Sequence, residues 1–211
     1  MFFPDYDGIE IKCQQRYSRY PLTLFSKALD GPYLYSTNEF LEKYGSKNYE
    51  YGKNEMNINI SANSLGICNS FFHKIKVDRI NQKIYIETYN YNYDLIERTY
   101  YVDFQSIKKI VELKLNMIAH IRASMKKIGN KRYFRYYSIK IYKIKSFECF
   151  ISLLEKGIIN CSFIGRVSKT NYTPGRNKNK GMHFSINQEN IEQLFDCIYY
   201  YSTDKKTNHF D

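Results

Sequence analysis

Tryptophan, long apolar runs and closely spaced cysteine pairs are all absent from this sequence of 211 residues. No stretch reaches the roughly 18 apolar residues that a membrane-spanning helix needs, so no membrane partner is expected. The cysteines are odd in number and none are spaced C-x-x-C, which argues against a disulfide framework and against a zinc knuckle. The same cysteine usage favours a reducing cytoplasm, and the first residues, MFFPD, lack the basic and apolar regions of a secretory signal.

Motifs for nucleotide binding and for nucleophilic catalysis are absent too. The sequence contains no P-loop, no Rossmann glycine pattern and no G-x-S-x-G elbow. We therefore expect no nucleotide cofactor and no serine or cysteine nucleophile. His73 and His120 have no partners at metal-ligand spacing, so the sequence assigns neither of them a role.

Positive charge is the strongest feature of what is present. The chain has 32 Lys and Arg against 21 Asp and Glu, a formal net charge of +11. Such a surface attracts polyanions, with nucleic acid as the first candidate and an anionic membrane as the second. Binding to nucleic acid would depend strongly on salt, because each neutralised phosphate releases counterions. A hydrophobic content of 43% predicts that the chain folds.

Hydrophobic periodicity predicts a mixture of helices and strands. Residues 119–125 fit either a strand or a helix, and the turn signal Gly129-Asn130 favours a hairpin with the aromatic segment 133–142. Other strands are predicted at 8–13, 22–25, 71–77, 83–89, 158–167 and 182–186. Helices are predicted at 36–44 (with a capping box of Ser36 or Thr37 and Glu39), within 102–115, from 146 to about 156, and from Asn187 with Ile191, Leu194, Phe195 and Ile198 inward.

The order of these elements indicates an α/β or mixed α+β fold. We expect a single domain over residues 1–203 and a loose tail over residues 204–211.

Asp5, Glu10 and Lys12 form the pattern P-D-x4-E-x-K, read from Pro4. Two carboxylates supply the hard oxygen ligands that Mg²⁺ prefers, and a bound metal lowers the pKa of water. A nearby lysine can orient that water or stabilise developing charge on a phosphate. Glu10 and Lys12 project from one face of a strand, and Gly8 allows a turn that brings Asp5 beside them. The alternative is a surface strand that carries an ordinary Glu–Lys pair.

A series of motifs, taken in chain order over roughly residues 4 to 200, resembles the MvaI/BcnI family of restriction endonucleases. The strand Gly8-Ile9-Glu10-Ile11-Lys12 and the segment Leu22-Thr23-Leu24-Phe25 resemble the family's G-I-E-L-K strand and T-L-F segment. The resemblance continues with Lys76-Val77-Asp78-Arg79, Phe147-Glu148-Cys149-Phe150 before Leu154 and Gly157-Ile158, and Gly181-Met182-His183-Phe184-Ser185-Ile186.

This resemblance implies a PD-(D/E)xK core of the MutH-like branch, a mixed sheet flanked by helices that forms a two-lobed cleft around duplex DNA. It implies a type II-like restriction endonuclease, dependent on Mg²⁺, that hydrolyses duplex DNA at a short specific site and leaves 5′-phosphate ends. Catalysis is then assigned to Asp5, Glu10 and Lys12, and metal binding to Asp5, Glu10 and the backbone carbonyl of Ile11. A cognate DNA methyltransferase can accompany such an enzyme, and no direct contact with it is implied.

The basic segment between Lys156 and Gln188 contains no acidic residue and is the candidate DNA-contacting region. Arginine can bind guanine edges, histidine can also reach base edges, and lysine can hold phosphates. The alternative is a solvated loop that keeps the protein soluble. The predicted DNA-binding residues are Arg166, Lys169, Arg176, Lys178, Lys180 and His183, together with Arg16 and Arg19 near the catalytic strand. A second basic group, Lys126, Lys127, Lys131, Arg132 and Arg135, surrounds the turn at Gly129-Asn130 and could follow a DNA backbone.

Two further hypotheses stay open. Only four residues precede Asp5, fewer than in other family members, so the chain is alternatively a truncated, non-catalytic DNA-binding remnant. The other hypothesis is a basic RNA-binding protein, although no RNP-type aromatic motif is present. Lys180 also precedes Gly181 where the family carries histidine; if that histidine reads a base edge, the recognition sequence or specificity is expected to differ.

Overall fold

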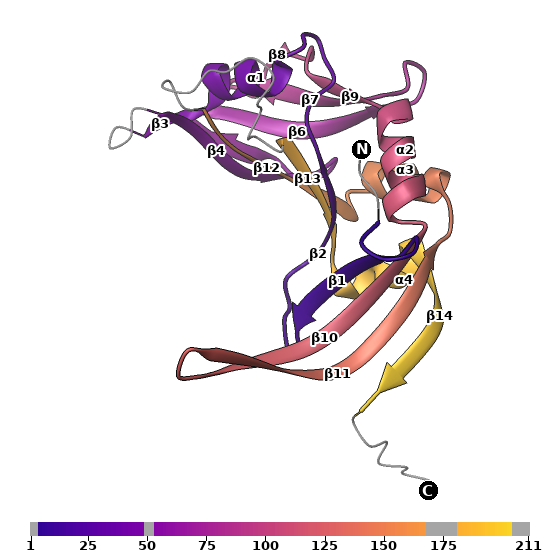
Figure 1. Cartoon of the computed structure of the whole chain (residues 1–211). Helices are drawn as coiled ribbons and strands as arrows, with labels where there is room; N and C mark the ends of the chain where they lie inside the picture. The colour runs from indigo at the N-terminus through magenta and orange to yellow at the C-terminus, as the bar shows by residue number, and fades with distance from the viewer. Residues whose placement is uncertain (1–3, 49–52, 168–180, 204–211) are drawn as a thin grey trace, which may run out of the picture. The chain divides into compact units, whose positions relative to one another are not determined.

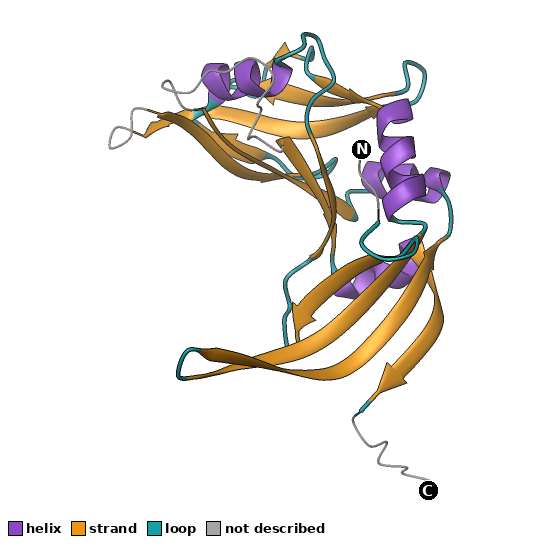
Figure 2. Cartoon of the chain, viewed as in Figure 1, coloured by secondary structure: helices purple, strands orange, loops and turns teal. Residues whose placement is uncertain are grey.

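The computed structural model describes residues 4–48, 53–167 and 181–203 (Figure 1). The chain forms two compact units. Unit 1 comprises residues 1–22, 110–147 and 187–211, and unit 2 comprises residues 23–109 and 148–186. The expected mixture of helices and strands is confirmed (Figure 2). Among the described residues, no helix is long and apolar enough to cross a membrane.

Unit 1 is built on a four-stranded sheet in the order β1-β10-β11-β14. β1 (Glu10–Gln15) runs parallel to β10 (Met117–Ile128), with Glu10 opposite Ile118. β10 and β11 (Lys131–Ile144) form the antiparallel hairpin that the Gly129-Asn130 turn predicts. Gly129 has a φ of 59°, which suits glycine at this tight turn. Strand β10 thus resolves the ambiguity of residues 119–125 in favour of a strand.

The C-terminal helix expected from Asn187 is wrong beyond Leu194. A 3-10 turn, η1 (Gln188–Asn190), and a short helix, α4 (Ile191–Leu194), lead directly into strand β14 (Phe195–Ser202). Ile198, expected to point inward, is 53% exposed. The run is rich in tyrosine, which favours strands, and β14 obtains its backbone hydrogen bonds from β11. Pairing with a distant strand therefore decides the secondary structure of this segment, whose local periodicity also fits a helix.

Unit 2 contains two sheets and most of the buried aromatic side chains. The first has the order β2-β13-β12-β4-β3, and the second has β5-β6-β7-β8 with β9 paired to β7. The predicted strands and the 71–89 hairpin are confirmed within a few residues, whereas β3, β4, β5, β8 and β9 had no prediction. The bounds are β2 Leu22–Lys27, β3 Ser46–Asn48, β4 Lys53–Ile60, β5 Gly66–Cys68, β6 Phe71–Asp78, β7 Lys83–Tyr89, β8 Leu95–Glu97, β9 Tyr101–Asp103, β12 Ile159–Val167 and β13 Gly181–Ile186.

Two aromatic clusters form the core of unit 2. Phe40, from helix α1 (Ser36–Tyr44), packs with ring centroids 4.9 to 5.3 Å from those of its partners Tyr44, His73, Tyr100 and Phe163. Phe150, from helix α3 (Phe147–Glu155), packs against Phe25 of β2 and Phe184 of β13. These side chains are at most 5% exposed, and each one that is fully buried contributes roughly 2–3 kcal/mol. Aromatic packing therefore joins α1 and α3 to the five-stranded sheet.

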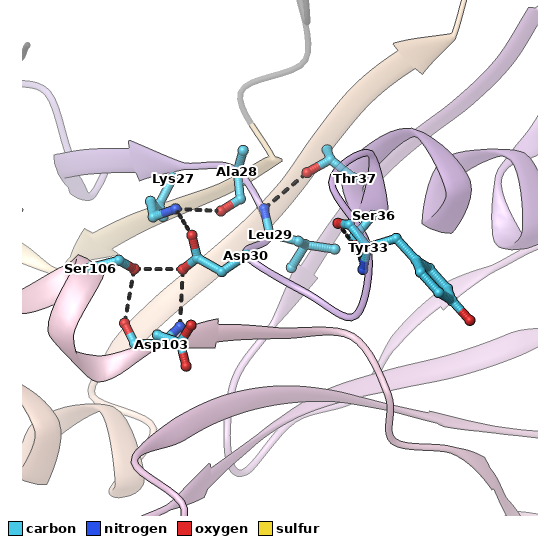
Figure 3. A network of polar contacts seen from close by, with 9 residues as sticks. All are labelled: Lys27, Ala28, Leu29, Asp30, Tyr33, Ser36, Thr37, Asp103 and Ser106. Carbon is cyan, nitrogen blue, oxygen red and sulfur yellow. Dashed lines mark hydrogen bonds and ion pairs between the residues drawn. The ribbon is translucent and has the colours of Figure 1, made fainter. Parts of the chain in front are cut away.

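The start of α1 differs from the expected capping box. The hydroxyl of Ser36 bonds backward to the N–H and carbonyl of Tyr33, and Thr37 Oγ1 accepts the N–H of Leu29 at 2.9 Å (Figure 3). The N-cap residue is Tyr35, and no side chain among the described residues caps the helix there. The polar residues are used instead to hold the preceding loop, because the chain must enter α1 from the end of β2.

Asp30 fixes the start of helix α2 (Phe104–Lys114) within unit 2. Its carboxylate accepts the backbone N–H of Asp103 at 3.0 Å and the hydroxyl of Ser106, and it pairs with Lys27 (Figure 3). Ser106 also contacts the carbonyl of Asp103 at 2.9 Å. A carboxylate at a helix N-terminus is stabilised by the helix dipole. The helix expected within 102–115 is confirmed by α2.

Candidate active site

The chain turns back on itself immediately before β1. Tyr6 and Ile9 form an antiparallel bridge with N–O distances of 3.0 and 2.7 Å. Asp7 and Gly8 have φ values of 41° and 79°, the positive values that a two-residue type I′ turn requires. Asp-Gly is a favoured sequence for this turn. The turn therefore directs Asp5 back along β1, as the glycine at this position predicts.

The carboxylate of Asp5 lies beside the backbone that follows Glu10. Its Oδ2 accepts a hydrogen bond of 2.9 Å from the backbone N–H of Ile11. Asp5 is exposed, whereas Glu10 is 5% exposed. The two acidic residues of the motif thus lie at the same end of β1, one at the surface and one in the interior.

Glu10 shares one carboxylate oxygen with two lysines. Its Oε1 accepts a hydrogen bond of 2.8 Å from Nζ of Lys12, and Nζ of Lys114 lies 3.5 Å from the same atom. Glu10 and Lys12 are two residues apart in β1, so they project from one face of the strand. Lys114 comes from the end of α2 and carries no signal in the sequence that links it to Glu10. The structure therefore brings a third charged group to the predicted Glu–Lys pair.

The state of the second carboxylate oxygen of Glu10 indicates whether a cation fits beside this residue. Glu10 Oε2 is buried and has no hydrogen-bond partner within the described residues. An unsatisfied buried carboxylate oxygen is costly unless a ligand satisfies it. Mg²⁺ is commonly held by one or two carboxylates and keeps several waters. The donor set of Glu10 with Asp5 therefore fits this ion.

The remaining ligands of such an ion would be backbone or water oxygens. Among the described residues, no group of three or more His, Cys, Asp or Glu side chains could hold a metal. The backbone carbonyl of Ile11 stays a prediction for the third ligand. Two carboxylates with open positions suit a metal that must also admit a substrate phosphate.

Gln14 extends the face of β1 into a polar network that the sequence does not reveal. Its Oε1 lies 3.0 Å from Nε2 of His120 and accepts a hydrogen bond of 3.1 Å from Nε2 of Gln188. Gln188 also donates to the carbonyl of Ser18 at 2.7 Å. His120 lies opposite Lys12 in the parallel pairing, so it belongs to the same region of the sheet. Spacing along the chain could not identify His120 or Gln188, because the contacts are long-range.

A small cationic cavity adjoins this network in unit 1. It encloses about 160 Å³ and is lined by His120, Arg122, Ser138, Lys140, Tyr142, Gln188, Ile191 and Tyr200. Burial lowers the pKa of His120 to about 4, and the charges of Arg122 and Lys140 add to this effect. The imidazole is therefore neutral near pH 7. Burial also lowers the pKa of Arg122, whose Nη1 donates to the carbonyls of Gln15 and Ser18.

Arg16 and Arg19 follow β1, as the sequence indicates. The guanidinium of Arg16 lies 3.9 Å from the ring centroid of Tyr137 and 5.0 Å from that of Tyr17. Such stacking holds the arginine in place. Arg19 is exposed in the loop between β1 and β2. Their contacts with DNA stay predictions.

The open face of the five-stranded sheet in unit 2 carries Arg166 and His183. His183 is half-buried, with Nδ1 2.9 Å from the hydroxyl of Ser26, and Arg166 Nη2 pairs with Glu55 at 2.8 Å. Both line a hollow of about 770 Å³. The opposite face of the same strands holds the buried residues Phe163 and Phe184. The other predicted DNA-binding residues, Lys169, Arg176, Lys178 and Lys180, lie outside the described residues.

Comparison with known proteins gives the family. The model of the MvaI/BcnI restriction endonuclease family matches residues 2–195. The structure is similar to that of the restriction endonuclease MvaI in complex with its cognate DNA substrate, with a TM-score of 0.79 and 26% identity, over 95% of this chain and 80% of that one. The match to MvaI in the absence of DNA has a TM-score of 0.69 and 26% identity, over 92% and 78%.

No curated protein sequence matches the chain. The family model nevertheless covers nearly all of it, and the expected resemblance and fold are confirmed. The matched residues include the turn before β1 and the buried Glu10 with its two lysines. The chain belongs to the MvaI/BcnI restriction endonuclease family.

Proposed function

We propose that this restriction endonuclease cleaves duplex DNA at a short specific site in a Mg²⁺-dependent reaction that leaves 5′-phosphate ends. The observation that carries the proposal is the carboxylate of Glu10, buried, held at Oε1 by two lysines and unpartnered at Oε2 among the described residues. Asp5 lies at the same end of β1. MvaI, to which the chain is similar, has been solved with its cognate DNA.

Each of these side chains has a role that its position supports. Asp5 and Glu10 would hold Mg²⁺, which when bound lowers the pKa of a water and stabilises charge on the phosphate. Lys12, 19% exposed and bonded to Glu10, is near enough to orient the attacking water or to stabilise the charge that develops on a phosphate oxygen. The network of Gln14, His120 and Gln188 positions β1, the strand that carries Glu10 and Lys12.

Sequence recognition is proposed for unit 2. The hollow that contains His183 and Arg166 offers imidazole and guanidinium groups, which bind base edges in the major groove. Arg166 would have to exchange its pairing with Glu55 for a base or a phosphate. We also propose that the enzyme works in the cytoplasm, with a DNA methyltransferase of the same specificity protecting the host site.

Cleavage of supercoiled plasmid tests the proposal. The wild-type protein should nick or linearise plasmid with Mg²⁺ and should be inactive in EDTA. Lys12→Ala should lower the rate by at least about a hundredfold, because it removes a cation beside the reacting phosphate. Lys76→Ala is the matched control, since it removes an exposed lysine of unit 2. Full activity of Lys12→Ala would show that the catalytic assignment is wrong.

Two further readouts separate the alternatives. If the products are labelled by a polynucleotide kinase only after phosphatase treatment, they carry 5′-phosphates. Salt-dependent binding of duplex DNA without cleavage in Mg²⁺ or Mn²⁺ would instead favour the non-catalytic remnant. Tighter binding of RNA than of duplex DNA would favour the RNA-binding hypothesis.

A further inference from the structure

The distal half of the β10–β11 hairpin projects beyond its sheet. Pairing of β1 with β10 ends at Ala123, and pairing of β14 with β11 begins at Ser138. Residues 124–137 therefore form a two-stranded ribbon that no other strand of the described residues flanks (Figure 1). We call these residues the ribbon. A two-stranded ribbon is marginal by itself, so its length needs a reason other than packing.

The ribbon is densely basic and contains no acidic residue. Its five cations are Lys126, Lys127, Lys131, Arg132 and Arg135, and all of them are exposed. No ion pair within the described part of the chain joins any of them to a carboxylate. Like charges at this density repel one another and destabilise the free ribbon. A polyanion would relieve that repulsion.

One face of the ribbon continues the face that carries the candidate active site. Alternation along β10 puts Ser124 and Lys126 on the side of His120 and Arg122. Ser124 lies opposite Arg135, so Arg135 belongs to that side as well. His120 itself lies opposite Lys12. A line of positive groups thus runs from the catalytic strand toward the tip of the hairpin.

Tyr137 links the catalytic strand to this line of charge. Its ring contacts two guanidinium groups, those of Arg16 at 3.9 Å and Arg135 at 5.1 Å, and its hydroxyl accepts a bond of 3.3 Å from Ser124. That hydrogen bond, with the charges of Arg135 and Arg16, lowers the pKa of the Tyr137 phenol. The base of the ribbon is therefore held in place relative to β1.

Aromatic side chains are interspersed with the cations along the second strand of the ribbon. Tyr133, Phe134 and Tyr136 are 52%, 58% and 60% exposed. Tyrosine with arginine or lysine is the combination that contacts the sugar and phosphate groups of nucleic acids. An acidic protein partner would satisfy the charge alone, whereas duplex DNA is an elongated polyanion that matches the charge along the whole ribbon and offers sugar groups to the tyrosines.

We propose that the ribbon binds the sugar-phosphate backbone of duplex DNA outside the cleaved step. This inference rests on the proposed function. Lys126 is eight residues beyond Ile118, the partner of Glu10, which corresponds to roughly 26 Å along a strand. At about 3.4 Å per base pair, the ribbon reaches DNA roughly eight base pairs from the scissile phosphate. It would fix the enzyme on its substrate without reading sequence.

Binding to duplexes of two lengths tests the inference. Affinity is measured by fluorescence anisotropy with Ca²⁺ in place of Mg²⁺, on duplexes of about 10 and about 30 base pairs centred on the mapped cleavage site. If no cleavage is found, the same two lengths of arbitrary sequence serve, so binding by the ribbon is measured whether or not the chain cuts DNA.

The test variant is the triple substitution Lys126→Gln, Lys131→Gln and Arg135→Gln. It should weaken binding to the long duplex by roughly tenfold to a hundredfold and lower its salt slope by about two to three, while the short duplex changes by less than about threefold. The control is Lys76→Gln, Lys109→Gln and Lys143→Gln, which removes the same charge from exposed positions. It should change neither duplex by more than about threefold.

Three outcomes would overturn the inference. They are equal losses on both lengths, no loss on either, or an equal loss in the control variant. If circular dichroism shows that the triple variant unfolds, the single variant Lys131→Gln at the exposed turn should lower the salt slope on the long duplex by about one. If the triple variant loses affinity only for the long duplex and the wild type does not cleave DNA, the proposed function is wrong and the ribbon inference stands. If the wild type cleaves DNA but the loss does not depend on duplex length, the ribbon inference is wrong and the proposed function stands.

Discussion

Strand β1 of unit 1 and the central strands of the five-stranded sheet of unit 2 bury opposite kinds of side chain. In unit 2, Phe163 and Phe184 fill the interior and polar groups such as His183 lie on the open face. In β1 of unit 1, Glu10 is 5% exposed while its apolar neighbour Ile11 is 41% exposed. The comparison teaches that unit 2 gains its stability from apolar burial, whereas strand β1 of unit 1 gives up such burial to hold charged groups.

The largest expected effect on activity comes from removing the buried carboxylate of Glu10, and it tests the contrast between the two units. Glu10→Gln should lower the cleavage rate by roughly ten-thousandfold, a loss on the scale measured for essential catalytic groups. Stability to urea should fall only slightly, because the loss of the two lysine contacts is partly offset by removal of a buried charge, and both lysines keep some access to solvent. A large loss of stability would show instead that Glu10 holds the fold together.

Truncation of a buried aromatic residue in unit 2 should give the reverse pattern. Phe163 is fully buried against Phe40, and its replacement by alanine should lower the free energy of unfolding by about 3 to 5 kcal/mol. The rate per folded molecule should change little, since the residue touches none of the candidate catalytic groups. Urea unfolding and single-turnover cleavage measure the two quantities, and a selective loss of rate would contradict the division of roles.

The two buried histidines offer a smaller test through pH. Burial lowers the pKa of His73 to about 4, and His73 packs among Phe40 and Tyr44 with Nε2 unpartnered in the described structure. The unfolded chain then binds a proton below pH 6.5 that the folded chain does not bind until near pH 4. The stability is therefore complete above about pH 6.5 and falls as the pH drops toward 4.

The expected size is up to about 3 kcal/mol for this histidine, from a pKa difference of about 2.5. His73→Leu should flatten the dependence of unfolding free energy on pH between 7 and about 4 by that amount. His120→Gln in unit 1 is the matched comparison, because burial also lowers the pKa of His120 to about 4. Equal slopes for wild type and His73→Leu would show that His73 does not control this loss.

Local patterns were sufficient for the strand that carries the motif and for the hairpins. The alternation at 8–13 predicted β1 and the shared face of Glu10 and Lys12, and the turns at Asp7-Gly8 and Gly129-Asn130 lie where glycine indicated them. Period and turn chemistry act within a few residues, so they can be recognised without a fold. The C-terminal segment failed because its residues suit two periods, and pairing with β11 decided between them.

Residues far apart in the chain completed the candidate site. Lys114 and Gln188 approach Glu10 and Gln14 across 104 and 174 positions, and no spacing in the sequence announces either contact. The burial of Glu10 could not be predicted from the sequence either, because alternation shows which residues share a face of the strand but not which face the fold covers.

The sequence by itself determined the positive charge, the chemistry of the Asp–Glu–Lys motif and most of the local elements, because these depend on residue type and short-range geometry. Only the tertiary structure decided that the charged face of β1 is the buried one, that Lys114 shares an oxygen of Glu10, and that the basic hairpin extends past its sheet. Those features arise from strand order and register, which depend on contacts between distant segments.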